Sequence, residues 1–375
     1  MFILNKFHML KMIFLYPLSL LYGLVVYVRN FLYDYNILKS TDFDIPVISV
    51  GNITAGGTGK TPHTEYLITL LKKHVEVVTL SRGYKRKTKG FKLVETHSSV
   101  TEVGDEPLQI KRKFPEITVA VDEDRVHGIK KLLQADVQPD AVLLDDAFQH
   151  RRVKAGINIL LIDYNRPIDS DHLLPLGRLR ERKYQQRRAN VIIYTKCSDQ
   201  ITPIKRRIIM KEVNLRPYQS LYFTTMDYGD PVAVFPDVAV PIPDMHETQV
   251  ASLLLSGIAG PGPFRDHLSS KTNVLDELVF GDHHRFSPKD VRQIVQKYEQ
   301  VKDMDPFILT TEKDAMRLRD DVSIPDEVGS RLYYIPISVK FLQSEGKSFD
   351  KKIVGYVKDN RSNRRLHTEK NNRTT

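Results

Sequence analysis

A glycine-rich segment in the first sixth of the chain constrains the fold more than any other feature. Residues 51–62 read Gly-Asn-Ile-Thr-Ala-Gly-Gly-Thr-Gly-Lys-Thr-Pro. The segment follows an apolar β-type run at residues 47–50 and leads into a helical pattern over residues 66–71. A strand, a glycine-rich turn and a helix N-terminus are the context in which backbone N–H groups bind phosphate. The segment therefore predicts a nucleoside triphosphate site.

The side chains of this segment suit a triphosphate carrying Mg²⁺. We expect Lys60 to reach the outer phosphates and the Thr61 hydroxyl to bind Mg²⁺. The residues expected around the phosphates are Thr54, Ala55, Gly56, Gly57, Thr58, Gly59, Lys60 and Thr61. Thr54 stands where the usual GxxxxGK[ST] pattern begins with glycine. A glycine-rich turn that binds nothing is the alternative, and the intact Gly-Lys-Thr element makes it the weaker one.

Short apolar runs alternate with helical patterns along the first part of the chain. Strand-like runs occupy residues 75–80, 117–121, 141–144, 157–162 and 189–195. Continuous apolar strands separated by helices are typical of a parallel sheet with helices on both faces. We therefore expect an α/β fold with a P-loop NTPase-like parallel sheet covered by helices and a second, smaller α/β domain.

Composition shifts divide the chain into five expected regions. An N-terminal helical segment covers residues 1–40, and the phosphate-loop domain covers residues 41–226. Proline clusters in residues 227–250, which indicates a connection. A smaller α/β domain is expected over residues 251–345, followed by a basic tail at residues 346–375.

Two adjacent carboxylates follow the apolar run at residues 141–144. Asp145 and Asp146 fall at the carboxyl end of a predicted strand, where ligands of parallel sheets gather. Such a pair alone is a weak signal, because aspartate at a strand end often caps the next helix. Together with an upstream phosphate loop, it predicts that Asp145 and Asp146 join Thr61 in binding Mg²⁺.

The charge balance points to an anionic partner. The 375 residues carry a formal net charge of +10 and one cysteine, Cys197, so an internal disulfide is excluded. Nucleic acid, an anionic membrane and a phosphorylated substrate all remain open on charge alone.

The N-terminal segment has the composition of a membrane-associated helix. Residues 12–28 carry no charge, which is at the short limit for a membrane span. Pro17 and Gly23 interrupt the run, so two short helices are as compatible with it as one. Tyrosines and flanking cations favour the lipid headgroup region. A helix lying on the membrane is the preferred interpretation, ahead of a helix buried on the following domain and of a full span.

Several motifs together resemble tetraacyldisaccharide 4'-kinase, the lipid A 4'-kinase of the Gram-negative inner membrane. They are the loop at residues 51–62, Ser-Arg-Gly-Tyr at 81–84, Gly-Asp-Glu-Pro at 104–107, Asp-Asp-Ala-Phe-Gln-His at 145–150, Leu-Leu-Pro-Leu-Gly-Arg-Leu-Arg-Glu at 173–181, Asp-His-His at 282–284 and Thr-Glu-Lys-Asp-Ala at 311–315. The resemblance runs from residue 17 to residue 337, and the family's loop also lacks the first glycine. Ala147 departs from it, since glycine is common there in the family.

The resemblance implies transfer of the ATP γ-phosphate to the 4'-hydroxyl of tetraacyldisaccharide 1-phosphate, in lipid A biosynthesis. It implies a peripheral or monotopic protein held by its N-terminal helix at the cytoplasmic face of the inner membrane. Asp105 is implied as the base that removes the hydroxyl proton, together with a histidine of the 282–284 motif. His283 is preferred over His284, although the sequence does not separate them. A helix N-cap is the alternative role for Asp105.

Further polar residues are implied in anion binding. Gln149 and His150 are expected near the γ-phosphate or the sugar, and Arg180 and Arg125 near the phosphates, because arginine binds phosphate bidentately. Glu312, Lys313 and Asp314 match a family motif, and their residue types do not indicate a chemical role for them.

Two other function classes stay open at this point. A membrane-peripheral switch ATPase is the first, but Ala55 stands where that class typically has an extra lysine. A nucleic-acid-associated ATPase is the second, and the dispersed basic residues do not support it. We expect ATP and Mg²⁺ as cofactors, the anionic lipid and the membrane surface as partners, no nucleic acid, and no obligate protein partner.

Overall fold

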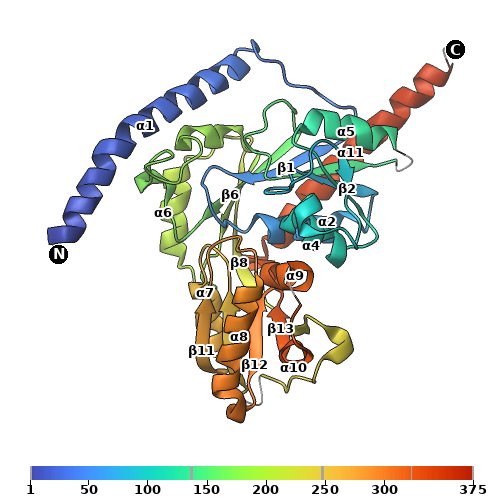
Figure 1. Ribbon diagram of the computed structural model, residues 1–375. Helices are drawn as coiled ribbons and strands as arrows, with labels where there is room; N and C mark the ends of the chain where they lie inside the picture. Colours follow the sequence, from blue (N-terminus) through green and yellow to red (C-terminus); the bar gives the residue numbers. More distant parts are fainter. Residues whose placement is uncertain (1, 136–137, 246–248, 322, 374–375) are drawn as a thin grey trace.

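The chain forms two α/β lobes, with a long N-terminal helix along the outside of the larger lobe (Figure 1). The structure is a computed structural model that describes residues 2–135, 138–245, 249–321 and 323–373. Each lobe is built on its own sheet, and helices cover both sheets. The mixed α/β fold with a parallel sheet that the apolar runs predict is confirmed.

The larger lobe contains a nine-stranded sheet in the order β14-β8-β7-β6-β1-β5-β2-β4-β3. Its strands are β1 (Val47–Asn52), β2 (Val77–Ser81), β3 (Lys92–Leu93), β4 (Thr118–Val121), β5 (Ala141–Asp145), β6 (Ile157–Asp163), β7 (Val191–Thr195), β8 (Ser220–Tyr228) and β14 (Ile337–Phe341). The seven inner strands are parallel, and the two edge strands run antiparallel to their neighbours. Parallel strands buried on both faces explain the continuous apolar runs in the sequence.

Helices enclose an apolar core on each face of this sheet. One core contains Leu67, Ile110 and Phe349 and lies under α2 (Lys60–Leu71), α4 (Asp105–Lys113) and α11 (Gly346–Arg373). Two further cores contain Ile129 and Phe223, and the helices nearest to them are α5 (Arg125–Gln134) and α6 (Pro203–Val213). The short α3 (Val100–Val103) and 3₁₀ turns at Ile168–Ser170 and Lys183–Arg188 complete the lobe.

The smaller lobe has a five-stranded sheet in the order β11-β10-β12-β13-β9. Its strands are β9 (Val232–Ala233), β10 (Ala251–Ser256), β11 (Asn273–Val279), β12 (Phe307–Thr311) and β13 (Leu332–Ile335), with β9 antiparallel. Its helices are α7 (Gly262–Ser269), α8 (Pro288–Val301), α9 (Glu312–Asp321) and α10 (Asp326–Gly329), with 3₁₀ turns at Pro236–Val238 and Lys302–Met304. Ser287 and Asp290 form a capping box that starts α8.

The chain returns to the larger lobe after β13. β14 pairs antiparallel with β8, a 3₁₀ turn follows at Leu342–Ser344, and α11 packs on the larger lobe's core. This differs from the expected division, in which residues 251–345 form one domain and residues 346–375 a tail. The smaller lobe is inserted between two adjacent strands of the large sheet. The edge strand β14 is five residues long and follows β13 closely, so its pattern of apolar and polar residues did not mark it as a separate strand in the sequence.

The N-terminal helix α1 (Phe2–Asp34) is continuous and includes Pro17. Its span from Met12 to Asp34 is long and apolar enough to cross a membrane, by length and composition alone. Only 11% of its most apolar window is buried, so a helix mainly buried on the following domain is wrong. Ser19, Gly23 and Asn30 lie on the buried face, whereas the exposed face carries Ile13, Phe14, Leu20, Leu21, Leu24, Val25, Tyr27 and Phe31.

Candidate phosphotransfer site

The loop between β1 and α2 has the backbone conformation of a phosphate-binding loop. Gly56 and Gly59 have φ angles of 106° and 83°, in the left-handed region that favours glycine. Gly59 is the N-cap of α2, and a Cβ there would lie 2.5 Å from Met226 Cε. Asn52 Nδ2 donates to Thr58 Oγ1 at 2.7 Å, which ties the loop to the end of β1. The helix N-terminus therefore points its free N–H groups into the loop.

The segment at residues 173–181 braces the other side of this loop. The Ala55 N–H donates to the Arg178 carbonyl at 2.7 Å, and the Arg180 N–H donates to the Ile53 carbonyl at 2.7 Å. Lys196 donates to the Gly57 carbonyl. These contacts hold the phosphate loop from both flanks.

The two candidate Mg²⁺ carboxylates occupy different surroundings. Asp145 is fully buried in β5 and accepts a hydrogen bond from Thr64 Oγ1 at 3.0 Å. Asp146 has a φ of 46° and turns its carboxylate toward cations. Arg180 Nη1 donates to its two oxygens at 2.9 and 3.1 Å, and Lys60 Nζ lies 3.7 Å from Oδ1. The structure thus brings Lys60, Asp146 and Arg180 together.

These surroundings shift the pKa values of Asp145 and Asp146 in opposite directions. Burial, with Glu106 and Asp146 nearby, raises the pKa of Asp145 to about 7. Burial alone would also raise the pKa of Asp146, but Lys60 and Arg180 hold it below its usual range. Asp146 is therefore ionised at neutral pH, and a bound cation would ionise Asp145 as well.

Gln149 and Arg125 complete the polar surroundings of the aspartates. Gln149 Nε2 donates to the Asn52 carbonyl at 2.8 Å, and its Oε1 accepts from Arg180 Nη1 at 3.4 Å. Arg125 is buried and donates to the Asp145 carbonyl at 3.4 Å. Burial lowers the pKa of Arg125 to about 10, so it remains a cation.

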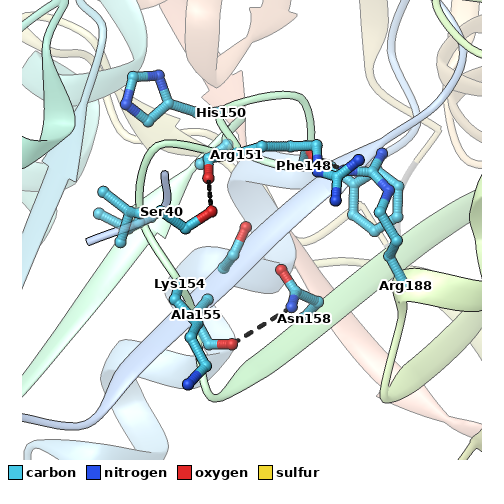
Figure 2. Close-up of a pocket in the computed structure, with 12 residues that line it drawn as sticks. Ser40, Phe148, His150, Arg151, Lys154, Ala155, Asn158 and Arg188 are labelled. Atoms are coloured by element: carbon cyan, nitrogen blue, oxygen red, sulfur yellow. Dashed lines mark hydrogen bonds between the residues drawn. The ribbon is translucent and has the colours of Figure 1, made fainter. Parts of the chain in front are cut away.

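His150 lies in a separate pocket beneath the loop that follows the aspartates. The pocket is also lined by Phe148, Asn158 and Arg188 (Figure 2). Burial, with Arg125 nearby, lowers the pKa of His150 to about 4, which keeps the ring neutral. Within the described part of the chain, its Nε2 is buried without a hydrogen-bond partner. A role of His150 at the γ-phosphate or the sugar stays a prediction.

The second candidate group joins the two lobes. Asp105 begins α4 of the larger lobe, and His283 lies in the loop after β11 of the smaller lobe. Their atoms Oδ2 and Nδ1 are 2.9 Å apart. His284 faces elsewhere: its Nε2 is 3.0 Å from Asp290 Oδ2. The geometry therefore separates the two histidines, which the sequence did not.

A buried arginine that the sequence did not predict belongs to this group. Arg317 Nη2 donates to Asp105 Oδ2 at 2.5 Å, and Nη1 donates to Asp314 Oδ1 at 2.9 Å. Next to them, Lys313 Nζ donates to Glu106 Oε1 at 2.5 Å. The motif at residues 311–315 thus anchors the smaller lobe to the start of α4. Arg317 falls one turn of helix after Asp314, a spacing that could have drawn attention to it.

The residues at the loop fit a magnesium nucleotide. Apart from Gly57 itself and its two chain neighbours, no heavy atom of the described residues lies within 4 Å of a Cβ built on Gly57, so there is space beside the loop. Among the described residues, no group of three or more His, Cys, Asp or Glu side chains forms a closed metal site. Mg²⁺ needs no such group, because it is usually held by one or two carboxylates, water and phosphate oxygens. Thr61, Asp145 and Asp146 offer that set.

Comparisons with known proteins agree on one family. A family model described as Tetraacyldisaccharide-1-P 4'-kinase matches residues 11–357. Proteins named Tetraacyldisaccharide 4'-kinase match over nearly the whole chain. The protein from Bacteroides thetaiotaomicron is 46% identical over 359 residues, covering 93% of this chain and 94% of the relative. That from Flavobacterium johnsoniae is 44% identical over 347 residues, covering 92% and 97%.

A solved structure has the same fold. The crystal structure of the "apo" form of LpxK from Aquifex aeolicus in complex with ATP matches with a TM-score of 0.69 and 30% sequence identity. The match covers 91% of this chain and 97% of that chain.

Proposed function

Because the chain belongs to the tetraacyldisaccharide-1-P 4'-kinase family, we propose that it transfers the γ-phosphate of ATP to the 4'-hydroxyl of tetraacyldisaccharide 1-phosphate. The observation that carries the proposal is the Asp105–His283 contact, a carboxylate–imidazole pair formed between the two lobes. The pair lies near the phosphate loop, since Glu106, which follows Asp105 in the chain, interacts electrostatically with Lys60. ATP as donor is supported by the solved relative, which is in complex with ATP.

The cations at the loop would stabilise the transferred phosphate. Charge is spread over the phosphoryl oxygens in the transition state, so fixed positive groups lower the barrier. Lys60 and Arg180 already share Asp146, and Arg125 lies behind Asp145. Thr61, Asp145 and Asp146 would hold Mg²⁺. When bound, Mg²⁺ would neutralise charge between the β- and γ-phosphates.

The Asp105–His283 pair would take the proton of the sugar hydroxyl. Asp105 Oδ2 lies 2.5 Å from Arg317 Nη2 and 2.9 Å from His283 Nδ1. Arg317 Nη2 also lies 3.3 Å from His283 Nδ1, but the two shorter contacts converge on the carboxylate oxygen and favour the tautomer in which Nδ1 donates to Asp105. With Nδ1 donating to Asp105, His283 Nε2 carries the free lone pair. We therefore assign His283 Nε2 as the proton-accepting atom, with Asp105 fixing the ring and stabilising the imidazolium.

The exposed apolar face of α1 supports a peripheral position on a lipid surface. Helices on water-soluble lobes normally turn their apolar face inward, and α1 does the opposite. Its inward face is held by polar contacts, such as that of Ser19 Oγ to the Leu173 carbonyl at 2.8 Å. A helix fixed along the lobe in this way favours lying in the membrane interface over crossing it. We place the protein at the cytoplasmic face of the inner membrane, where ATP and the lipid substrate meet.

A phosphotransfer assay tests the proposal. Purified protein is incubated with Mg-ATP and tetraacyldisaccharide 1-phosphate in detergent, and the product is analysed for a 4'-phosphate. Asp105→Ala should lose the product, whereas Asp199→Ala, an exposed aspartate of the same lobe, should retain it. ATP hydrolysis without a phosphorylated lipid in the wild-type protein would contradict the proposal and favour a switch ATPase.

A further inference from the structure

The buried face of α1 rests on the same segment that braces the phosphate loop. Ser19 Oγ donates to the Leu173 carbonyl, and Tyr22 OH donates to the Arg180 carbonyl at 3.0 Å. A Cβ built on Gly23 would lie 2.8 Å from Leu173 Cδ1, so the helix lies close against the segment there. The segment at residues 173–181 is therefore held between α1 and the phosphate loop.

Glu181, at the end of this segment, hydrogen-bonds both to α1 and to the candidate site. Its side chain is 0% exposed. Oε1 accepts from Asn30 Nδ2 at 2.9 Å and from Arg29 Nη2 at 3.0 Å, and both donors belong to α1. Oε2 accepts from Gln149 Nε2 at 3.2 Å and from Arg188. One oxygen of the Glu181 carboxylate therefore accepts hydrogen bonds from α1, and the other accepts one from Gln149 of the candidate site.

The contacts continue from Glu181 to the candidate Mg²⁺ carboxylate. Gln149 donates to the Asn52 carbonyl and accepts from Arg180, which holds both oxygens of Asp146. The route Asn30–Glu181–Gln149–Arg180–Asp146 is a continuous series of hydrogen bonds. Because a buried carboxylate is costly to leave without partners, each donor on Glu181 restricts where that carboxylate can lie.

Asn30 is an unusual residue for its helix. It is 2% exposed, on a helix whose outer face is apolar, and its amide is directed at Glu181. Arg29 is more exposed, and its guanidinium also contacts the Asn30 side chain at 3.4 Å. Asn30 is therefore the α1 side chain best suited to fix Glu181.

We propose that α1 positions the nucleotide site and that Asn30 is the positioning residue through which it acts. Asn30 fixes Glu181, Glu181 fixes Gln149, and Gln149 keeps Arg180 on Asp146. The site is then complete only when α1 is docked on the larger lobe, which links the lipid-facing helix to the binding of the phosphate donor. The inference rests on the proposed function for its effect on turnover, but its effect on nucleotide binding does not depend on the lipid substrate.

The test compares Asn30→Ala with Ser19→Ala in the full-length chain. Both residues are buried on the same face of α1 and hydrogen-bond to the same segment, but Ser19 contacts Leu173 rather than Glu181. Binding of Mg-ATP is measured by calorimetry without lipid, and kcat and KM are measured with the lipid substrate. Vesicle sedimentation and thermal unfolding show whether membrane binding and folding are intact.

Asn30→Ala should weaken Mg-ATP binding about 3- to 30-fold and lower kcat, the range expected for residues that couple two sites. Ser19→Ala should stay within about twofold of wild type, and vesicle binding should be unchanged in both. Asn30→Gln, which keeps an amide, should recover part of the loss. If Asn30→Ala does not fold, Asn30→Ser provides the same comparison.

Wild-type Mg-ATP affinity in Asn30→Ala, or an equal loss in Ser19→Ala, would overturn the proposal. Failure of the proposed function would look different. The wild-type protein would then form no 4'-phosphorylated lipid, while the difference in Mg-ATP binding between the two variants would persist.

Discussion

Arg317 Nη2 lies 2.5 Å from Asp105 Oδ2, and both side chains are buried. The guanidinium comes from the smaller lobe and the carboxylate from the larger lobe, so the contact crosses the lobe boundary. Burial alone would raise the pKa of Asp105, but His283, Lys313 and Arg317 together hold it far below its usual range. The carboxylate therefore stays ionised at neutral pH and can orient His283.

Arg317→Gln should lower kcat about 10- to 100-fold, because a hydrogen bond to a charged group contributes about 1.5–3 kcal/mol. Loss of the guanidinium should also raise the pKa of Asp105 toward its usual range. The lowered pKa of Asp105 stabilises the fold above the unfolded pKa, and this stability is lost as pH falls. When the pH is lowered, the free energy of unfolding of Arg317→Gln should therefore decrease less than that of the wild-type protein.

Kinetics and denaturation at several pH values check both effects of Arg317→Gln. Arg265→Gln, a half-exposed arginine on α7, is the control and should behave like wild type. An unchanged dependence of stability on pH in Arg317→Gln would show that the guanidinium does not act on Asp105.

A second cluster between the lobes should make stability fall as pH rises. Lys113 Nζ donates to Glu65 Oε2 at 2.6 Å and to Glu312 Oε2 at 3.2 Å, so two buried carboxyl groups share one cation. Burial, with Glu312 nearby, raises the pKa of Glu65 to about 7. The folded protein then binds a proton that the unfolded chain releases near pH 4–5, so stability is lost as pH rises toward 7.

Glu65→Gln should remove this part of the pH dependence. Between pH 5 and pH 8, the free energy of unfolding should decrease less in the variant than in wild type, by on the order of 2 kcal/mol. Urea denaturation at each pH measures the difference. The exposed Glu76→Gln should reproduce the wild-type curve. Parallel curves for wild type and Glu65→Gln would mean that Glu65 is ionised throughout.

Lys60→Ala should reduce phosphotransfer about 10²- to 10³-fold, because its ammonium is expected to stabilise charge on the transferred phosphate. Removing it also leaves Asp146 with Arg180 as its remaining close cation in the described structure. Lys73→Ala removes an exposed lysine just beyond the other end of α2 and should leave turnover unchanged. Single-turnover kinetics at saturating Mg-ATP separate the chemical step from binding. A near-normal rate in Lys60→Ala would contradict a role of the phosphate loop in phosphotransfer.

Leu24→Asp should reduce binding to anionic vesicles, since Leu24 is exposed on the outer face of α1 and a charge there opposes insertion. Its Mg-ATP affinity should be unchanged because the inner face of α1 is untouched. Ile204→Asp places the same charge at an exposed apolar residue of α6 and is the control. Vesicle sedimentation gives the comparison. Equal loss of binding in both variants would indicate a general charge effect.

The sequence predicted the parallel sheet and the family, and both are confirmed. The predicted strand, glycine-rich turn and helix are present at residues 47–71, and phosphate binding by this loop stays a prediction. These features are local: glycine conformation, apolar runs and motif spacing lie within short windows. The pairing of Asp105 with His283 was also predicted, but the choice of His283 over His284 needed the loop geometry that directs His284 to Asp290.

Arg317 and Glu181 were not predicted to act at the site. Each acts through partners far away in the sequence, 212 residues for Arg317 and Asp105 and 151 residues for Glu181 and Asn30. A single sequence carries no local signal for such contacts. The return of the chain to the large sheet was missed for the same reason, because β14 is recognised by its pairing with β8 rather than by its own pattern.

The inserted smaller lobe has a consequence for the order in which the protein is made. The phosphate loop emerges early in synthesis, but Phe349, Ile353 and Val357 of α11 complete the core beneath α2. Tyr66 of α2 likewise finds its partner only at Asp350, to which its hydroxyl donates at 2.8 Å. The ribosome therefore releases the whole smaller lobe before the helix that follows the phosphate loop is fully covered, so the nucleotide-binding half of the molecule begins first and is finished last.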